Sequence, residues 1–300
     1  MKDLLKLFGC WVAFIVAMMT SGIIGQAFHL AAMNIPHGTT MQAMFLAQLL
    51  GGAVLVVGLY PLARGLAARP LMRAAMIAAF LLFALGANGL IEIKLFTHFA
   101  DAGMASSIVV YVLLAALVGG AVGFCFGARG DTAGLATHAL SSATRSMPSL
   151  LARVGAAWLA WPFIYFFFGM CVAPIVVPYY KAGIAGLQLP QSMAFLFGIQ
   201  LIRSVLFLAT SLPFIAYWRG SRRGLWLALG MAHAFTIGLY GLIGTTFFPM
   251  VLRIAHSAEI TCDSFAYAGL LVLLFSAAAK KSGVSSEAAP VFASAAPATK

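Results

Sequence analysis

Residues 191–217 read QSMAFLFGIQLIRSVLFLATSLPFIAY, an apolar stretch in which Arg203 is the single charged residue. A helix needs roughly 20 apolar residues to cross a bilayer core about 30 Å thick, because its backbone amides are then bonded within the helix itself. Seven other stretches have the same length and character, and together they predict an all-α integral membrane protein with eight transmembrane helices. We expect these helices near residues 8–30, 41–62, 74–95, 106–127, 154–177, 191–217, 224–248 and 255–278.

The overall composition agrees with this class of protein. Of the 300 residues, 63% are hydrophobic and 8% are charged, whereas a soluble domain carries roughly 25% charged residues. The net charge of +11 could indicate nucleic-acid binding, in which basic surfaces neutralise phosphates. Here the basic residues lie between apolar runs, so we interpret them as determinants of membrane topology. The lipid bilayer is the predicted partner, and nucleic acid is not.

The basic residues alternate along the chain. Of the 18 lysines and arginines, 14 fall at every second boundary between apolar stretches, and three fall at the others. Basic loops remain in the cytoplasm, so both termini are predicted to be cytoplasmic in a multi-pass protein of the inner (cell) membrane. The first stretch is longer than the apolar part of a signal peptide and is not followed by an A-x-A site, which favours a retained helix. The 14 residues are Lys2, Lys6, Arg64, Arg69, Arg73, Arg129, Arg145, Arg153, Arg219, Arg222, Arg223, Lys280, Lys281 and Lys300.

The two halves of the sequence resemble each other. We divide the chain into residues 1–153, four helices and a cytoplasmic loop, residues 154–281, four more helices, and a disordered tail of residues 282–300. Repeats of four helices each would run parallel, related by an axis along the membrane normal. The predicted architecture is therefore a parallel 4+4 repeat. Met41, Phe45, Gln48, Leu49 and Pro61 recur as Met193, Phe197, Gln200, Leu201 and Pro213 at a constant offset of 152, and Trp11 matches Trp158.

Arg203 is the first candidate functional residue, because it lies midway along an apolar stretch. A charge at that depth costs roughly 2.5–3.5 kcal/mol on insertion scales, so it normally faces the interior of a bundle or a wet cavity. Gln200 shares its helical face, and Gln48 and Glu92 are the further candidates for a polar site that binds a substrate or ion. The alternative is a structural tie, in which Arg203 bonds to carbonyls or to a carboxylate of a neighbouring helix.

Histidines and carboxylates form a second group near the predicted outer face. His98 and Asp101 repeat the pattern of His256 and Glu259, a histidine followed by an acid three residues later, and Asp263 continues the second stripe. Imidazole and carboxylate groups suit metal coordination or a proton relay. Alternatively, polar residues simply gather at helix ends and outer loops.

These features favour a small secondary transporter or a channel-like protein. A non-catalytic subunit or assembly factor of a membrane complex, or a homo-oligomer, remains an alternative, as does a metal-dependent membrane enzyme. The sequence lacks GxxxxGK[ST], HExxH and GxSxG, so it gives no sign of the most easily recognised ATPases, metalloproteases and esterases. Neither the substrate nor a cofactor can be identified from the sequence.

Overall fold

The computed structural model describes residues 1–31, 40–98, 100–127, 146–190 and 192–276. Within these residues, eight helical spans are long and apolar enough to cross a membrane, which confirms the prediction of a polytopic helical membrane protein. The fifth span begins at Met147 rather than near residue 154. Its additional turns are held by Arg153, whose guanidinium donates to the Leu274 carbonyl in the last turn of the eighth span.

The spans are built from both single and composite helices. Spans three, four and seven each contain a π-helical turn, and the other five are continuous α-helices. The elements are α1 (Lys2–Ala27), α2 (Met41–Gly65), α3 (Pro70–Phe80), η1 (Leu81–Ala87), α4 (Asn88–Phe96), α5 (Ala100–Leu113), η2 (Leu114–Val118), α6 (Gly119–Cys125), α8 (Met147–Lys181), the short 3₁₀ turn η4 (Ile184–Gly186), α9 (Met193–Ala216), α10 (Arg222–His233), η5 (Ala234–Leu239), α11 (Tyr240–Gly244) and α12 (Met250–Phe275).

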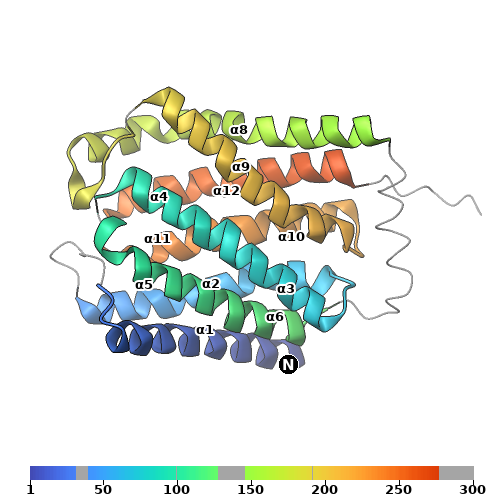
Figure 1. Cartoon of the computed structure of the whole chain (residues 1–300), viewed down its shortest axis with the longest axis horizontal. Helices are drawn as coiled ribbons and strands as arrows, with labels where there is room; N and C mark the ends of the chain where they lie inside the picture. Colours follow the sequence, from blue (N-terminus) through green and yellow to red (C-terminus); the bar gives the residue numbers. More distant parts are fainter. Residues whose placement is uncertain (32–39, 99, 128–145, 191, 277–300) are drawn as a thin grey trace, which may run out of the picture.

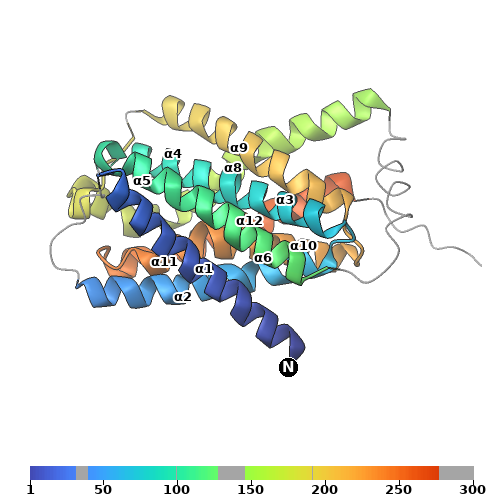
Figure 2. The same cartoon turned by 60° about the horizontal axis from the view of Figure 1, so that its bottom comes forward.

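The spans lie along the long axis of the molecule, so the bundle has two distinct ends (Figures 1 and 2). The turns at residues 66–69 and 217–221 lie at one end, together with the starts of α1 and α8 (Figure 1, right). We call this the basic end, because it carries Arg64, Arg69 and Arg219. The starts of α2, α5, α9 and α12 lie at the other end, called here the opposite end (Figure 1, left).

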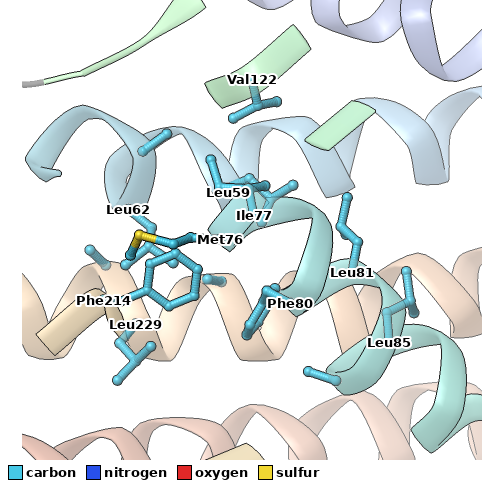
Figure 3. Close-up of a cluster of buried hydrophobic side chains, with 14 of the residues drawn as sticks. Leu59, Leu62, Met76, Ile77, Phe80, Leu81, Leu85, Val122, Phe214 and Leu229 are labelled. Atoms are coloured by element: carbon cyan, nitrogen blue, oxygen red, sulfur yellow. The ribbon is translucent and has the colours of Figure 1, made fainter. Parts of the chain in front are cut away.

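The half of the bundle near the basic end is packed with apolar side chains. Figure 3 shows this core, in which Phe80 of α3 and Phe214 of α9 approach each other. Their ring centroids are 5.7 Å apart in an edge-to-face arrangement, which is a favourable geometry for aromatic pairs. Other fully buried members come from α2 and η1, including Leu59 and Leu81. The core therefore joins spans from both halves of the chain.

Close helix packing in the first half depends on glycine. At Gly123 in α6, a Cβ atom would lie 2.3 Å from the Cα of Ala74 in α3, and at Gly119 it would lie 2.8 Å from the Cα of Ala78. Real side chains do not tolerate such distances, so only glycine lets the two backbones come this near. Small residues at this spacing are typical of tightly packed membrane helices.

Several local features occur once in each half of the chain. The Thr40 hydroxyl caps α2 by accepting from the Ala43 amide, and the Ser192 hydroxyl caps α9 by accepting from the Phe195 amide. Such caps satisfy amides that lack partners at a helix start. A proline lies near the end of each of these two helices, at Pro61 and Pro213.

Two tryptophans also make matching contacts. The indole nitrogen of Trp11 donates to the Leu49 carbonyl at 2.9 Å, and that of Trp158 donates to the Leu201 carbonyl at 2.9 Å. These bonds tie the first span to the second and the fifth span to the sixth. Both donors reach across to helices that begin at the opposite end.

Candidate functional site

A cavity of about 820 Å³ occupies the half of the bundle nearer the opposite end. This volume lies within the usual range for small-molecule sites, about 300–1,000 Å³. Its walls come mainly from spans three and five to eight, and most of the lining side chains are apolar or aromatic. Six of the nine residues predicted from the sequence as site residues line the cavity, namely Gln48, Glu92, Arg203, His256, Glu259 and Asp263.

Arg203 lies at the inner end of the cavity, midway along α9, and is 3% exposed. Its Nε donates to Asn88 Oδ1 at 2.6 Å, and its Nη1 donates to Gln200 Oε1 at 3.1 Å. Its Nη2 forms an ion pair with Glu92 Oε1. Asn88 and Glu92 lie one turn apart on α4, so the guanidinium joins the third span to the sixth. This is the geometry of the structural tie, and a role in ligand binding remains a prediction.

Aromatic rings surround this guanidinium. The centroids of the Tyr165, Phe207 and Trp161 rings lie 5.4, 5.8 and 5.9 Å from its central carbon. Aromatic faces attract cations at such distances. The Trp161 indole also donates to Gln200 Oε1 at 3.0 Å. The rings and the hydrogen bonds together hold Arg203 in one position at the floor of the cavity.

The carboxylates of α12 lie along the cavity wall. Glu259 is 7% exposed, and its Oε2 is 2.8 Å from His256 Nδ1. The other imidazole nitrogen, Nε2, is 3.1 Å from the Tyr180 hydroxyl of α8. Asp263 follows one turn deeper and is 2% exposed. Its Oδ1 has no hydrogen-bond partner within the described part of the chain.

The other predicted histidine–carboxylate pair is placed differently. His98 is exposed in the turn before α5 and does not line the cavity. Its backbone amide donates to the Gly186 carbonyl. The side chain of Asp101 lies outside the described residues. The structure therefore places only the second pair, His256 and Glu259, on the cavity wall. Among the residues described, no group of three or more His, Cys, Asp or Glu side chains could hold a metal ion.

Three important neighbours were not predicted from the sequence. Asn88 is 1% exposed and is a direct partner of Arg203. Its spacing of four residues before Glu92, on an otherwise apolar helix, was a signal that could have identified it. Tyr165 and Tyr180 lie within a run of aromatic residues, where nothing in the sequence separates cavity-facing rings from lipid-facing ones.

Known proteins provide no analogy for this arrangement. No protein-family model, no curated protein and no solved structure matches the chain. The function must therefore be argued from the geometry of the cavity.

Proposed function

We propose that this protein is a small secondary transporter, built from two parallel four-helix repeats, whose cavity binds a small amphipathic molecule. The observation that carries the proposal is the cavity itself, which has a fixed polar floor at Arg203. The apolar and aromatic walls suit the apolar body of such a ligand, and the few buried polar groups suit its polar end. Exposed residues of α8 and α9, among them Met170 and Met193, also line the cavity.

The turns at the basic end support the repeat. Leu66 and Trp218 form an antiparallel bridge. The Ala67 amide donates to the Tyr217 carbonyl at 3.0 Å, and the Arg219 amide donates to the Gly65 carbonyl at 3.0 Å. At the sequence offset of 152, Ala67 corresponds to Arg219 and Gly65 corresponds to Tyr217. The two hydrogen bonds are therefore equivalents of each other under this offset. Any antiparallel bridge relates its two bonds in this way, so the support for the repeat is that the bridged residues, Leu66 and Trp218, are separated by the offset found in the sequence.

Features inside the spans support the same axis. The helix caps at Thr40 and Ser192 are separated by 152 residues, and the bonds of Trp11 and Trp158 follow the sequence match. The π-helical turns of the third and seventh spans start at Leu81 and Ala234. These matches are what a repeat of the two halves would produce, whereas the π-helical turn of the fourth span has no counterpart in the continuous α12.

The polar floor breaks the symmetry of the repeat. At an offset of 152, Arg203 corresponds to Gly51 and Asn88 corresponds to Tyr240. These counterparts also meet, because a Cβ at Gly51 would lie 3.2 Å from the Tyr240 ring. The same location therefore carries a charged network on one side of the axis and a glycine–tyrosine contact on the other. A cavity between repeats with one polar side is suited to orient an asymmetric ligand.

A packed layer separates the floor from the basic end. His233 lies between Phe80 and Phe207, with ring-centroid distances of 5.0 and 5.6 Å. Its Nε2 is 2.9 Å from the Ser211 hydroxyl, which is fully buried. In a parallel-repeat transporter, rocking of the two halves around the binding site would open this layer and close the mouth. Because basic loops remain in the cytoplasm, the present shape is the outward-open one.

Cysteine labelling at this layer tests for transport. In protein lacking its four native cysteines, Ser211→Cys is nearly isosteric and lies two turns from Arg203 toward the basic end. A transporter must expose this position to a membrane-impermeant thiol reagent from the basic side during part of its cycle. The matched control is Ala228→Cys, a buried position of α10 near the basic end that does not line the cavity. Equal, negligible labelling of both would contradict alternating access.

A further inference from the structure

We propose that the cavity selects an organic cation, with the positive charge of the ligand held by Asp263 and Glu259 and its apolar body held by the aromatic walls. This rests on the proposed function and names the ligand class of the same cavity. Two features of the cavity point to it, namely an excess of carboxylates over cationic side chains and a buried oxygen of one of these carboxylates that lacks a hydrogen-bond partner.

The charges that face the cavity do not balance. Three carboxylates, Glu92, Glu259 and Asp263, line it together with the single guanidinium of Arg203. Arg203 forms its ion pair with Glu92. His256 is adjacent to Glu259, so even a protonated imidazole would neutralise only that carboxylate. Asp263 remains without a cationic neighbour among the ion pairs of the described residues.

Other bases in the cavity do not compensate for Asp263. His233 also lines it, but this imidazole contacts the Ser211 hydroxyl and the rings of Phe80 and Phe207. Its surroundings are therefore aromatic and neutral. None of the described cationic side chains forms an ion pair with Asp263, so a cationic ligand would be its direct partner.

Asp263 Oδ1 is buried and unpartnered, which is costly for a polar group. One turn further along α12, the Tyr267 hydroxyl lies beside Ser204, and Gln200 Nε2 has no partner within the described residues. Both Asp263 and Tyr267 line the cavity. A ligand that brings a positive charge to this place would satisfy the carboxylate, whereas an anionic ligand would add to the repulsion.

Glu259 presents its second oxygen to the same space. Its Oε2 is bonded to His256, and its Oε1 faces Gly169 of α8, where a Cβ atom would lie 3.2 Å away. Gly169 also lines the cavity and carries no side chain, so Oε1 lies against a bare part of the α8 wall. Glu259 and Asp263 are four residues apart on one helix, so their side chains lie on the same face.

The walls around these carboxylates are rich in aromatic rings. Trp161, Tyr165, Tyr180 and Tyr267 line the cavity on α8 and α12. The faces of such rings attract cations, and desolvated sites of this kind recognise ammonium ligands. Aromatic rings also bury large apolar areas. A lipophilic cation fits this combination better than a small hydrated ion does.

Two probes of nearly the same size and shape but opposite charge test the proposal. The purified full-length protein is equilibrated with radiolabelled tetraphenylphosphonium or with tetraphenylborate, and bound probe is measured at a fixed detergent concentration. We expect tetraphenylphosphonium to bind and tetraphenylborate not to bind. Asp263→Asn keeps the shape and removes the charge, and it should weaken cation binding about tenfold or more, equivalent to at least about 1.4 kcal/mol.

The matched control is Asp3→Asn, which removes a half-exposed carboxylate near the basic end, paired with Arg64. It should leave tetraphenylphosphonium affinity unchanged. A second cavity variant, Gly169→Ala, crowds Glu259 Oε1 without removing a charge and should also weaken binding. It keeps the proposal testable if Asp263→Asn does not yield folded protein.

The outcomes separate this proposal from the proposed function. Stronger binding of tetraphenylborate, or unchanged cation affinity in both cavity variants, would overturn the assignment of an organic cation. Binding of neither probe would also overturn it. Alternating access at Ser211→Cys is measured without any probe, so failure of the ligand class and failure of the transporter proposal can be told apart.

Discussion

Replacing Arg203 with leucine should destabilise the protein strongly. Arg203 is 3% exposed and Glu92 is about one-third exposed, so the carboxylate would lose its partner in a partly buried place. Breaking a buried ion pair by removing one partner costs about 3–5 kcal/mol, and the exposure of Glu92 places this case near 3 kcal/mol. Asn88 Oδ1 also loses a donor, which adds about 1 kcal/mol. Gln200 Oε1 keeps its bond from the Trp161 indole.

The total of about 4 kcal/mol corresponds to a fall of roughly 8–16 °C in the thermal midpoint, at about 2–4 °C per kcal/mol. The assay is thermal unfolding of the purified protein in detergent, followed by tryptophan fluorescence. The control is Arg64→Leu, because Arg64 and Asp3 form an exposed ion pair at 3.4 Å and such pairs contribute about 0–1 kcal/mol.

A double variant makes the test specific to the ion pair. Adding Glu92→Leu to Arg203→Leu removes the unpaired carboxylate, and apolar replacement of a whole buried pair is often nearly neutral. The double variant should therefore recover most of the lost stability. The reasoning is refuted if Arg203→Leu lowers the midpoint no more than Arg64→Leu does, or if Glu92→Leu adds a further loss.

The remaining predictions concern packing, the repeat and topology. Gly123→Ala should lower stability by about 1–3 kcal/mol through overpacking, whereas Gly120→Ala, with open space around its Cβ position, should be nearly neutral in the same thermal assay. Trp11→Phe and Trp158→Phe should each lose a similar amount, about 1 kcal/mol for one hydrogen bond, and clearly unequal losses would count against the repeat. A reporter fused after Arg153 should report the cytoplasm, and a signal there from the other side of the membrane would contradict the predicted topology.

Much of the fold follows from the sequence, because membrane-spanning helices have a simple physical requirement. Each must present about 20 apolar residues and bond its own backbone, so the eight spans appear directly in the apolar pattern. The end of an apolar stretch is a weaker signal. Arg153 lies inside α8 because it donates to a carbonyl of α12, which no local pattern reveals.

The candidate site was only partly predictable for a related reason. Arg203 is conspicuous because a charge within the membrane is expensive, and Glu92 was a reasonable partner for it. The histidine–acid pattern, by contrast, does not specify burial. His256 lies six residues inside α12, where it reaches the cavity, whereas His98 precedes the start of α5 and is exposed. The histidine of this short pattern thus lies within a helix in one half and before the start of a helix in the other.

The central claim is that the binding cavity opens away from the basic end. The most direct test is to measure from which side of the membrane the cavity can be labelled. Ala173 of α8 lines the cavity, so Ala173→Cys in cysteine-free protein can be labelled with a membrane-impermeant thiol reagent added to either side of sealed vesicles. We expect rapid labelling from the side opposite the basic loops, slow labelling from the basic side, and protection by tetraphenylphosphonium. Preferential labelling from the basic side, or no labelling from either side, would contradict the account.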